Sequence, residues 1–182
     1  MKRCNWVNLK NEKYVRYHDE EWGVREEDDK KLYELLILES FQAGLSWECV
    51  LNKRESFRLA FDDFSAERVS LYDDGKVEEL ISNEGIIRCK RKILAAIKNS
   101  RIFLDVQREF GSFKRYLDTF TCGEVIYEPY NARTTSPLSD AISKDLKRRG
   151  MSYVGSTIIY SYLQAVGMID GHGEECDCYK RH

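Results

Sequence analysis

Residues 38–47 read LESFQAGLSW, and they place a carboxylate where a helix is expected to bury apolar side chains. Leu32, Leu35 and Leu36 come before this stretch at the i, i+3, i+4 spacing of an amphipathic helix. The next position on the same face, i+7, is Glu39. Because a buried and unpaired carboxylate is costly, we expect either a raised pKa or a nearby cation.

The same stretch predicts a corner between two helices. Gln42 continues the face of Glu39, and Gly44 ends the helix. Ser46 can cap a second helix that begins at Trp47. An acid, an amide and an indole gathered at such a corner suit a flat, positively charged ligand. A second interpretation stays open at this point, in which the buried glutamate pairs with an arginine for structural reasons.

Composition indicates a mostly helical globular protein. The chain has 182 residues, of which 42% are hydrophobic and 33% charged, and only two are proline. It contains neither a run of about 18 apolar residues nor the apolar core of a signal peptide, so we expect a cytoplasmic protein without a membrane span. Six cysteines in a reducing compartment favour metal binding or simple burial over disulfides.

Periodicity and capping residues predict the order of the elements. Residues 1–27 are expected to be irregular and rich in aromatic residues, and residues 101–133 to hold one or two helices in a looser region. The expected helices cover residues 28–42, 47–61, 65–71, a short segment that ends at 83, a basic segment that continues through 97, 137–149 and 158–166. Nothing divides the chain, so we treat residues 1–182 as one unit with two helical lobes.

Residues 77–97 suggest a helix–hairpin–helix, with Gly85 in the connection and a basic helix after it. Arg88, Lys90 and Arg91 lie beside the turn. Backbone N–H groups at a helix start, together with nearby cations, can hold a phosphate. A solvated basic helix explains the same pattern equally well. Because the net charge is −2, any contact with nucleic acid must come from local patches such as this one.

The C-terminal tail has the spacing of a metal site. His172 and Cys176 are separated by three residues, and the distant Cys4 and His18 could complete a Cys2His2 set. Such a set suits tetrahedral, structural zinc and would clip the two ends of the chain together. Cys178 competes for the fourth position, and free buried cysteines remain an alternative explanation.

The chain resembles the 3-methyladenine DNA glycosylase I family of the helix–hairpin–helix glycosylase superfamily. The resemblance runs almost from end to end and rests on several separate blocks in the right order. These blocks are RCxW at 3–6, YHDxEWGV at 17–24, QAGLSW at 42–47, KRE at 53–55, GIIR at 85–88, SDA at 139–141, KRRG at 147–150, VGST at 154–157 and HxxxC at 172–176. Residues 110–134 do not match clearly, and the catalytic aspartate that most of the superfamily carries after the hairpin has no counterpart here.

The resemblance implies a fold and a base-binding pocket. The fold would be all-α, a helix–hairpin–helix glycosylase fold with a zinc clip that joins the two ends. Glu39 and Tyr17 would be the catalytic pair and hydrogen-bond the excised base, while Trp47 would stack on it. The residues that would line or support the pocket are Trp6, Tyr14 and Trp22.

The resemblance also implies the partners and the metal. A monomeric enzyme would bind alkylated double-stranded DNA and remove 3-methyladenine by hydrolysis without cutting the strand. Gly44 and Leu45 would enter the gap left by the flipped base, and the hairpin would hold the DNA backbone through Gly85, Arg88, Lys90 and Arg91. The structural zinc ligands would be Cys4, His18, His172 and Cys176. A lesion-binding module without catalysis, and a glycosylase for another base such as 3-methylguanine, are the alternatives.

Overall fold

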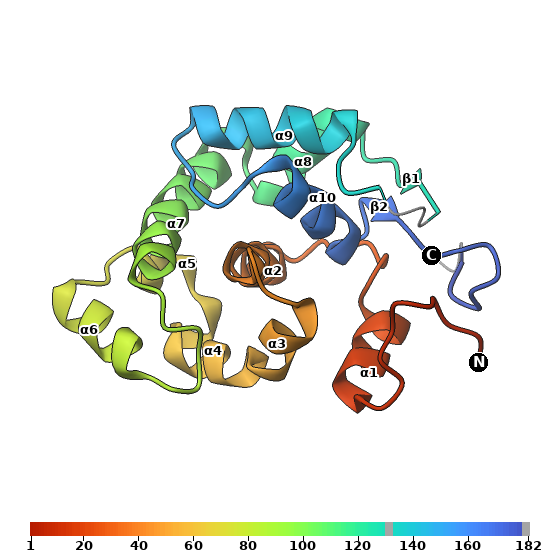
Figure 1. The fold of residues 1–182 in the computed structure, drawn as a ribbon. Coiled ribbons are helices and arrows are strands. Elements are labelled where there is room, and N and C mark those ends of the chain that lie inside the picture. The colour runs from red at the N-terminus through yellow and green to blue at the C-terminus, as the bar shows by residue number, and fades with distance from the viewer. Residues whose placement is uncertain (130–132, 180–182) are drawn as a thin grey trace.

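A computed structural model describes residues 1–129 and 133–179, and these segments form a mostly helical protein around one central helix (Figure 1). Its helices are α1 (Glu12–Glu20), α2 (Asp29–Gln42), α3 (Trp47–Asn52), α4 (Arg54–Ala60), α5 (Ala66–Val69), α6 (Asp74–Ser82), α7 (Lys90–Phe110), α8 (Phe113–Thr121), α9 (Pro137–Arg148) and α10 (Ser156–Ala165). A 3₁₀ turn, η1 (Asp62–Phe64), and two short strands, β1 (Ile126–Tyr127) and β2 (Ile169–Asp170), complete the list. Within the described segments, no helix is long and apolar enough to cross a membrane.

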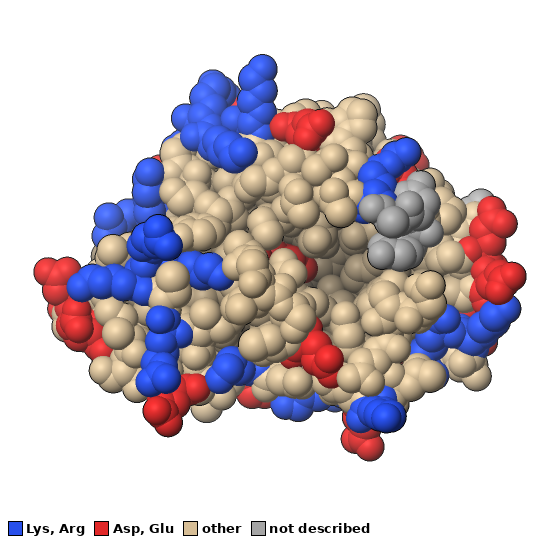
Figure 2. Space-filling model, in the orientation of Figure 1, with Lys and Arg blue, Asp and Glu red and all other residues tan. Residues whose placement is uncertain are grey.

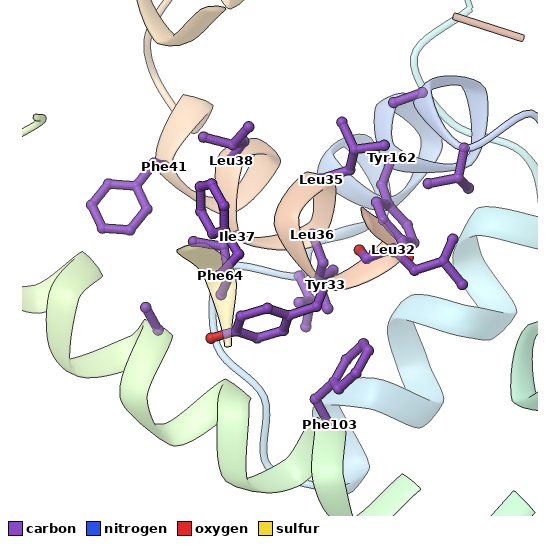
Figure 3. Packing of buried hydrophobic residues seen from close by; sticks show 14 of the residues in the cluster. Leu32, Tyr33, Leu35, Leu36, Ile37, Leu38, Phe41, Phe64, Phe103 and Tyr162 are labelled. Atoms are coloured by element: carbon purple, nitrogen blue, oxygen red, sulfur yellow. Dashed lines mark hydrogen bonds between the residues drawn. The ribbon is translucent and has the colours of Figure 1, made fainter. Parts of the chain in front are cut away.

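Helix α2 is the central element, and every residue from 32 to 41 is buried. It packs against α3, α7, α8 and α10, so it is enclosed on several sides. A helix that is apolar nearly all round is stable only in such an environment. Figure 3 shows side chains of α2 meeting Phe103 of α7 and Tyr162 of α10, whose hydroxyl donates to the carbonyl of Leu32 at 3.2 Å. Burying one such large apolar side chain contributes about 1.5–3 kcal/mol.

The ends of α2 follow the sequence expectation. Asp28 caps the N-terminus by accepting from the backbone N–H of Lys30. At the other end Gly44 has φ +79°, a left-handed conformation that suits glycine. Ser46 then caps α3 by accepting from the N–H of Cys49 at 3.2 Å. The predicted corner between two helices is confirmed.

Three expectations about the elements were wrong. Residues 12–20 form helix α1, because Asn11 caps it by accepting from Lys13 and Tyr14. The single helix expected over 47–61 is divided into α3 and α4 at Lys53, where ψ is 0°. Helix α7 continues to Phe110, beyond the expected basic segment, because its buried face repeats without interruption from Ile93 to Val106. The end of α7 and the whole of α8 agree with the one or two helices expected within residues 101–133, although that region is more regular than expected.

The two ends of the chain lie side by side. The backbone N–H of Asp177 donates to the carbonyl of Lys2 at 2.9 Å, and the N–H of Lys2 donates to the Asp177 carboxylate at 2.8 Å. Strand β1 pairs in parallel with β2, which fixes the segment that leads into this C-terminal tail. The short strand pair was not expected, whereas the mostly helical class is confirmed.

Candidate functional site

The chain encloses a cavity of about 140 Å³ beside the central helix. Figure 2 shows a hollow in this face of the molecule, with acidic atoms visible inside it. The residues around the cavity come from the N-terminal segment, α1, α2, α3 and α10. They are Trp6, Tyr14, Tyr17, Trp22, Glu39, Gln42, Trp47, Ser161 and Gln164. All six residues that sequence reasoning assigned to the pocket are therefore brought together.

Aromatic rings form most of the wall. The rings of Tyr17 and Trp47 have centroids 5.2 Å apart and are tilted by 49°. On the other side Trp6 meets Trp22 edge to face at 4.7 Å and Tyr14 at 5.5 Å. Such an arrangement presents flat apolar surface to a planar ligand.

Glu39 is the acidic group of the cavity, and it is only 3% exposed. Burial alone raises the pKa of its carboxyl to about 8, since neither an arginine nor a hydrogen bond offsets the loss of solvent. Its Oε2 atom has no hydrogen-bond partner among the described residues. Burial also raises the pKa of Tyr17 well above its usual range, so the phenol keeps its proton and can donate it in a hydrogen bond.

A neighbouring glutamate shows what a structural pair looks like in this fold. Glu34, also on α2, accepts from Arg54 at 2.7 Å and from Arg58 at 2.9 Å. Arg54 also donates to Glu21 at 2.7 Å, which fixes the end of α1 near α2. Because arginine pairs Glu34 and not Glu39, the structural interpretation of Glu39 is excluded for the described residues.

Unsatisfied polar atoms concentrate in the cavity. In the described part of the chain, seven buried side-chain nitrogen or oxygen atoms lack a hydrogen-bond partner. Four of them belong to residues around the cavity: Trp6 Nε1, Glu39 Oε2, Trp47 Nε1 and Gln164 Nε2. Buried polar groups are normally paired, so this concentration points to a polar ligand that supplies the partners.

The turn after α2 lies beside the start of α7. Gln42 Nε2 donates to the carbonyl of Leu45 at 2.8 Å and so holds the turn, while Leu45 itself is 40% exposed. Lys92, in the first turn of α7, donates to the carbonyls of Phe41 and Ala43 at 2.7 and 2.6 Å. The pocket helix is thus joined to the basic segment, a contact that sequence reasoning missed.

The basic residues of the predicted hairpin are exposed between α6 and α7. The backbone N–H of Gly85 donates to Asn83 Oδ1 at 2.8 Å, which closes the connection. Arg88 lies 3.4 Å from Glu84, and Lys90 lies 3.0 Å from Glu78. Exposed pairs of this kind contribute little and exchange readily for another anion. Figure 2 shows basic side chains gathered on the side of the molecule where Figure 1 places α6 and α7.

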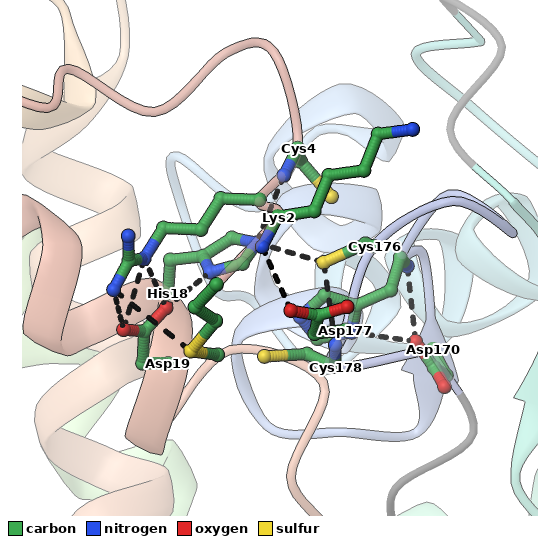
Figure 4. A network of polar contacts seen from close by, with 11 residues as sticks. Lys2, Cys4, His18, Asp19, Asp170, Cys176, Asp177 and Cys178 are labelled. Atoms are coloured by element: carbon green, nitrogen blue, oxygen red, sulfur yellow. Dashed lines mark hydrogen bonds and ion pairs between the residues drawn. The ribbon is translucent and has the colours of Figure 1, made fainter.

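A second cluster joins the ends of the chain. His18, His172, Cys176 and Cys178 are all buried, and their potential ligand atoms lie within 4.8 Å of one another (Figure 4). Cys4, expected as the fourth ligand, lies at the edge of this group, where its backbone N–H faces His18 Nε2 at 3.4 Å. Burial, together with Cys176 nearby, raises the pKa of the Cys4 thiol to about 12. Three of the four expected ligands are therefore grouped, together with the competitor Cys178.

The orientation of both imidazoles fits a metal. Nδ1 of His18 lies 2.8 Å from Asp19, and Nδ1 of His172 lies 2.8 Å from Asp170. These carboxylates leave Nε2 of each ring facing the sulfur atoms, and His172 Nε2 has no partner among the described residues. Carboxylate–histidine pairs of this type orient metal ligands in proteins. Two nitrogen and two sulfur donors suit a structural zinc ion.

The arrangement around the cavity is typical of proteins that take up a single flat base from a nucleic acid, with aromatic walls, a buried carboxylate and a basic helix start close by. A model of the methyladenine glycosylase family matches residues 6–180, and the chain belongs to this family.

Curated relatives and solved structures agree over the whole length. DNA-3-methyladenine glycosylase 1 of Escherichia coli is 41% identical, with 98% of this chain and 97% of that protein covered. The DNA-3-methyladenine glycosylase of Haemophilus influenzae is 36% identical, with 97% of both covered. A crystal structure of 3-methyladenine DNA glycosylase I matches with a TM-score of 0.93 at 41% identity, over 98% of this chain and 100% of that one. The Staphylococcus aureus enzyme, in a structure on 3-methyladenine recognition, matches with a TM-score of 0.91 at 31% identity, over 96% and 95%.

Sequence reasoning missed two residues of the pocket. Ser161 and Gln164 lie three positions apart on α10, so both are on one face of that helix. Two polar residues at this spacing inside an otherwise apolar helix are the signal that could have identified them.

The raised pKa of Glu39 predicts how stability depends on pH. Between the ordinary pKa of 4.5 and about 8, the folded protein keeps a proton that the unfolded chain releases. Wild-type stability should therefore fall as pH rises through this window. Glu39→Gln cannot titrate, so its melting temperature relative to wild type should increase steadily from pH 5 to pH 8, as followed by circular dichroism.

Glu34→Gln is the matched control, because it removes a buried carboxylate that is paired with Arg54 and Arg58. It should be less stable than wild type at every pH in this range. A constant difference between Glu39→Gln and wild type across the range would show that Glu39 is already ionised in the folded protein.

Proposed function

We propose that this protein is a monofunctional DNA glycosylase that flips 3-methyladenine out of alkylated double-stranded DNA and hydrolyses its N-glycosidic bond. The single observation that carries the proposal is the buried carboxylate of Glu39, without a partner among the described residues, in an aromatic cavity. Membership of the methyladenine glycosylase family supports it, as do relatives named for this activity and a solved variant in complex with 3-methyladenine.

The chemistry of the lesion explains why a carboxylate is useful. Methylation at N3 leaves the base in DNA with a positive charge, which weakens the bond to the sugar. Water adds to C1′, the base leaves with the bonding electron pair as neutral 3-methyladenine, and a proton passes to solvent. The enzyme therefore has to select the cation and orient water, rather than protonate a reluctant leaving group.

Each residue of the cavity has a proposed role in this reaction. Glu39 loses its proton when the cationic base enters and then stabilises the positive charge, while Tyr17 donates a hydrogen bond to the base. Trp47 stacks on the base, which returns part of the cost of flipping. Trp6, Tyr14 and Trp22 close the wall around it. The nine residues around the cavity include no lysine, in agreement with hydrolysis without strand cleavage.

The segment from Gly44 to Leu45 is proposed to fill the gap that the flipped base leaves in the duplex. Its exposed leucine and its hydrogen-bonded turn support this role. The connection at Gly85 and the first turn of α7 are proposed as a helix–hairpin–helix that holds the DNA backbone. The hydrogen bonds from Lys92 to the end of α2 would hold the two DNA-contacting segments in a fixed position relative to each other.

A structural zinc ion is proposed for the cluster at the chain ends. His18, His172 and Cys176 would provide three ligands, and either Cys4, as the family resemblance implies, or Cys178, as the grouping favours, the fourth. The ion would supply folding energy and take no part in the chemistry.

We also propose that residues 1–182 act as one monomeric unit in the cytoplasm. One hydrophobic cluster runs from Tyr17 to Ile169, and the six cysteines are all free, as in a reducing compartment.

Charge removal at Glu39 tests the central role of the pocket. Glu39→Gln keeps the shape of the side chain, so excision of 3-methyladenine should fall by roughly 10- to 1000-fold through loss of transition-state stabilisation. The affinity of Glu39→Gln for neutral adenine should change much less. Trp47→Ala should instead weaken the binding of 3-methyladenine and of adenine alike, because stacking depends little on the charge of the base. The measurement is the single-turnover release of free base from methylated DNA, followed by chromatography.

The same chromatography separates the alternatives. A lesion-binding module would release no base, and a glycosylase of wider range would also release 3-methylguanine. If Glu39→Gln has the wild-type excision rate and the wild-type preference for 3-methyladenine over adenine, the carboxylate does not select the cationic base.

Neutralising the hairpin tests the DNA contacts. The triple variant Arg88→Gln, Lys90→Gln, Arg91→Gln should bind all duplexes more weakly, and the slope of log affinity against log salt should be shallower by up to about 3. Selectivity between bases should not change, because backbone contacts position the protein without specifying sequence. Fluorescence anisotropy at several salt concentrations measures both quantities.

A triple variant on α9, with Lys144, Lys147 and Arg148 changed to Gln, has the same change in charge. It should keep the wild-type salt slope. If the α9 variant loses affinity and the hairpin variant does not, α9 is the DNA-binding surface.

Metal content tests the clip. Freshly purified protein should contain about one zinc ion per chain, and His172→Ala should lose it together with much of the stability that the metal provides. Elemental analysis of Cys4→Ala and Cys178→Ala identifies the fourth ligand, since only the true ligand is required for full occupancy. The exposed Cys122→Ala is the control, and stoichiometric zinc in His172→Ala would refute the assignment.

A further inference from the structure

Helix α10 brings an amide to the cavity that no role above uses. Gln164 lies on the same face of α10 as Ser161, and both residues line the cavity. It is only 8% exposed. Its Nε2 atom is buried and has no hydrogen-bond partner among the described residues. Leaving such a donor unpaired destabilises the folded protein, so packing alone does not explain why the side chain is an amide.

The position of this amide is fixed by its surroundings. The carbonyl of Gln164 accepts from the N–H groups of Gly23 at 2.9 Å and Gly167 at 3.2 Å, which anchors its backbone. The side chain occupies a slot that exists because residue 171 is glycine. A Cβ on Gly171 would lie 2.5 Å from Gln164 Nε2 and 2.9 Å from the ring of Trp22. The amide is therefore held against an indole of the wall, where free rotation is restricted.

The unsatisfied atoms of the cavity form a complementary set. Glu39 of α2 offers an acceptor, and Gln164 of α10 offers a donor. A 3-methyladenine base has one exocyclic amino group, a donor, flanked by the ring nitrogens N1 and N7, both acceptors. In a 3-methylguanine base the corresponding edge carries a carbonyl oxygen beside an N1–H, so the donors and acceptors are exchanged there. N7 is an acceptor in both purines, so an amide N–H aimed at N1 distinguishes them.

We propose that Gln164 is a specificity-determining residue, whose amide N–H donates to N1, the ring-nitrogen acceptor next to the amino group of the bound base. This inference rests on the proposed function and adds a second recognition element to it. Glu39 selects for positive charge, and Gln164 selects for the adenine pattern of hydrogen-bond acceptors. A residue that hydrogen-bonds a substrate rejects analogues without the matching group, because its own buried atom is then left unpaired.

The test pairs a variant with base analogues. Gln164→Met keeps the length of the side chain and removes the donor. Calorimetry then measures the affinity of wild type and variant for 3-methyladenine, 1-deaza-3-methyladenine and 7-deaza-3-methyladenine. Wild type should bind 1-deaza-3-methyladenine about 10-fold more weakly than it binds 3-methyladenine, whereas Gln164→Met should bind the two equally. The 7-deaza compound should lose the same factor with both proteins.

Two outcomes would overturn the proposal. Equal losses in wild type and variant for the 1-deaza compound would show that Gln164 does not donate to N1. An unchanged preference for 3-methyladenine over 3-methylguanine in Gln164→Met would show that it does not select the base. Gln164→Glu, which keeps the shape and presents only acceptors when ionised, repeats the comparison if the methionine variant does not fold, as judged by circular dichroism.

The proposed function can fail separately. If wild type releases no 3-methyladenine from methylated DNA, the glycosylase assignment fails, and the analogue comparison with free bases still reports on Gln164. If wild type releases the base, but wild type and Gln164→Met show the same relative affinities for the analogues, only the inference about Gln164 fails.

Discussion

The candidate site depends on the burial of one unpaired carboxylate in helix α2, whose residues from 32 to 41 are all buried. Glu39 is enclosed with the rest of α2, and burial raises its pKa to about 8. An ion pair in the same helix shows the usual solution, since Arg54 and Arg58 neutralise Glu34. Glu39 has instead an aromatic cavity in front of it. The cost of burying an acid without a partner is what makes the cavity favour a cation.

The cavity is complete only because the first 22 residues are held against α2 and α10. Trp6, Tyr14, Tyr17 and Trp22 come from this segment, which is attached at several places, among them hydrogen bonds from Asn8 and Asn11 to Glu48 of α3 at 2.8 and 2.7 Å. Arg54 joins Glu21 at the end of α1 to Glu34 on α2. The histidine–cysteine cluster joins His18 to the tail at 172–178. The last two attachments adjoin the aromatic wall, since the ring of His172 lies 4.6 Å from that of Trp22 and Glu21 directly precedes Trp22. Their effect on base binding therefore acts through the placement of this wall.

Much of this could be predicted from local patterns in the sequence. The end of α2, the turn at Gly44 and the cap at Ser46 follow from residues within a few positions of one another, and all were correct. Features decided by distant contacts were missed. Helix α1 was expected to be irregular because its aromatic residues line the cavity and so do not follow the usual pattern of a buried helix face. The break between α3 and α4 was missed because no proline or glycine lies at Lys53. Ser161 and Gln164 carry a local signal in their spacing, but only the tertiary fold, which brings α10 to α2, shows which cavity they line. Cys178 entered as a competitor, and the choice between it and Cys4 depends on how the tail folds back.

The most direct test of the account is a count of the protons released when a cation enters the cavity. The probe is 3,9-dimethyladeninium, whose positive charge is fixed, titrated into the protein by calorimetry at pH 7 in two buffers of different ionisation enthalpy. Because the carboxyl of Glu39 has a pKa of about 8 when the cavity is empty, wild type should release most of one proton per bound cation, and Glu39→Gln should release none. Binding by wild type without proton release would contradict the claim that a neutral, buried Glu39 ionises to select the cationic base.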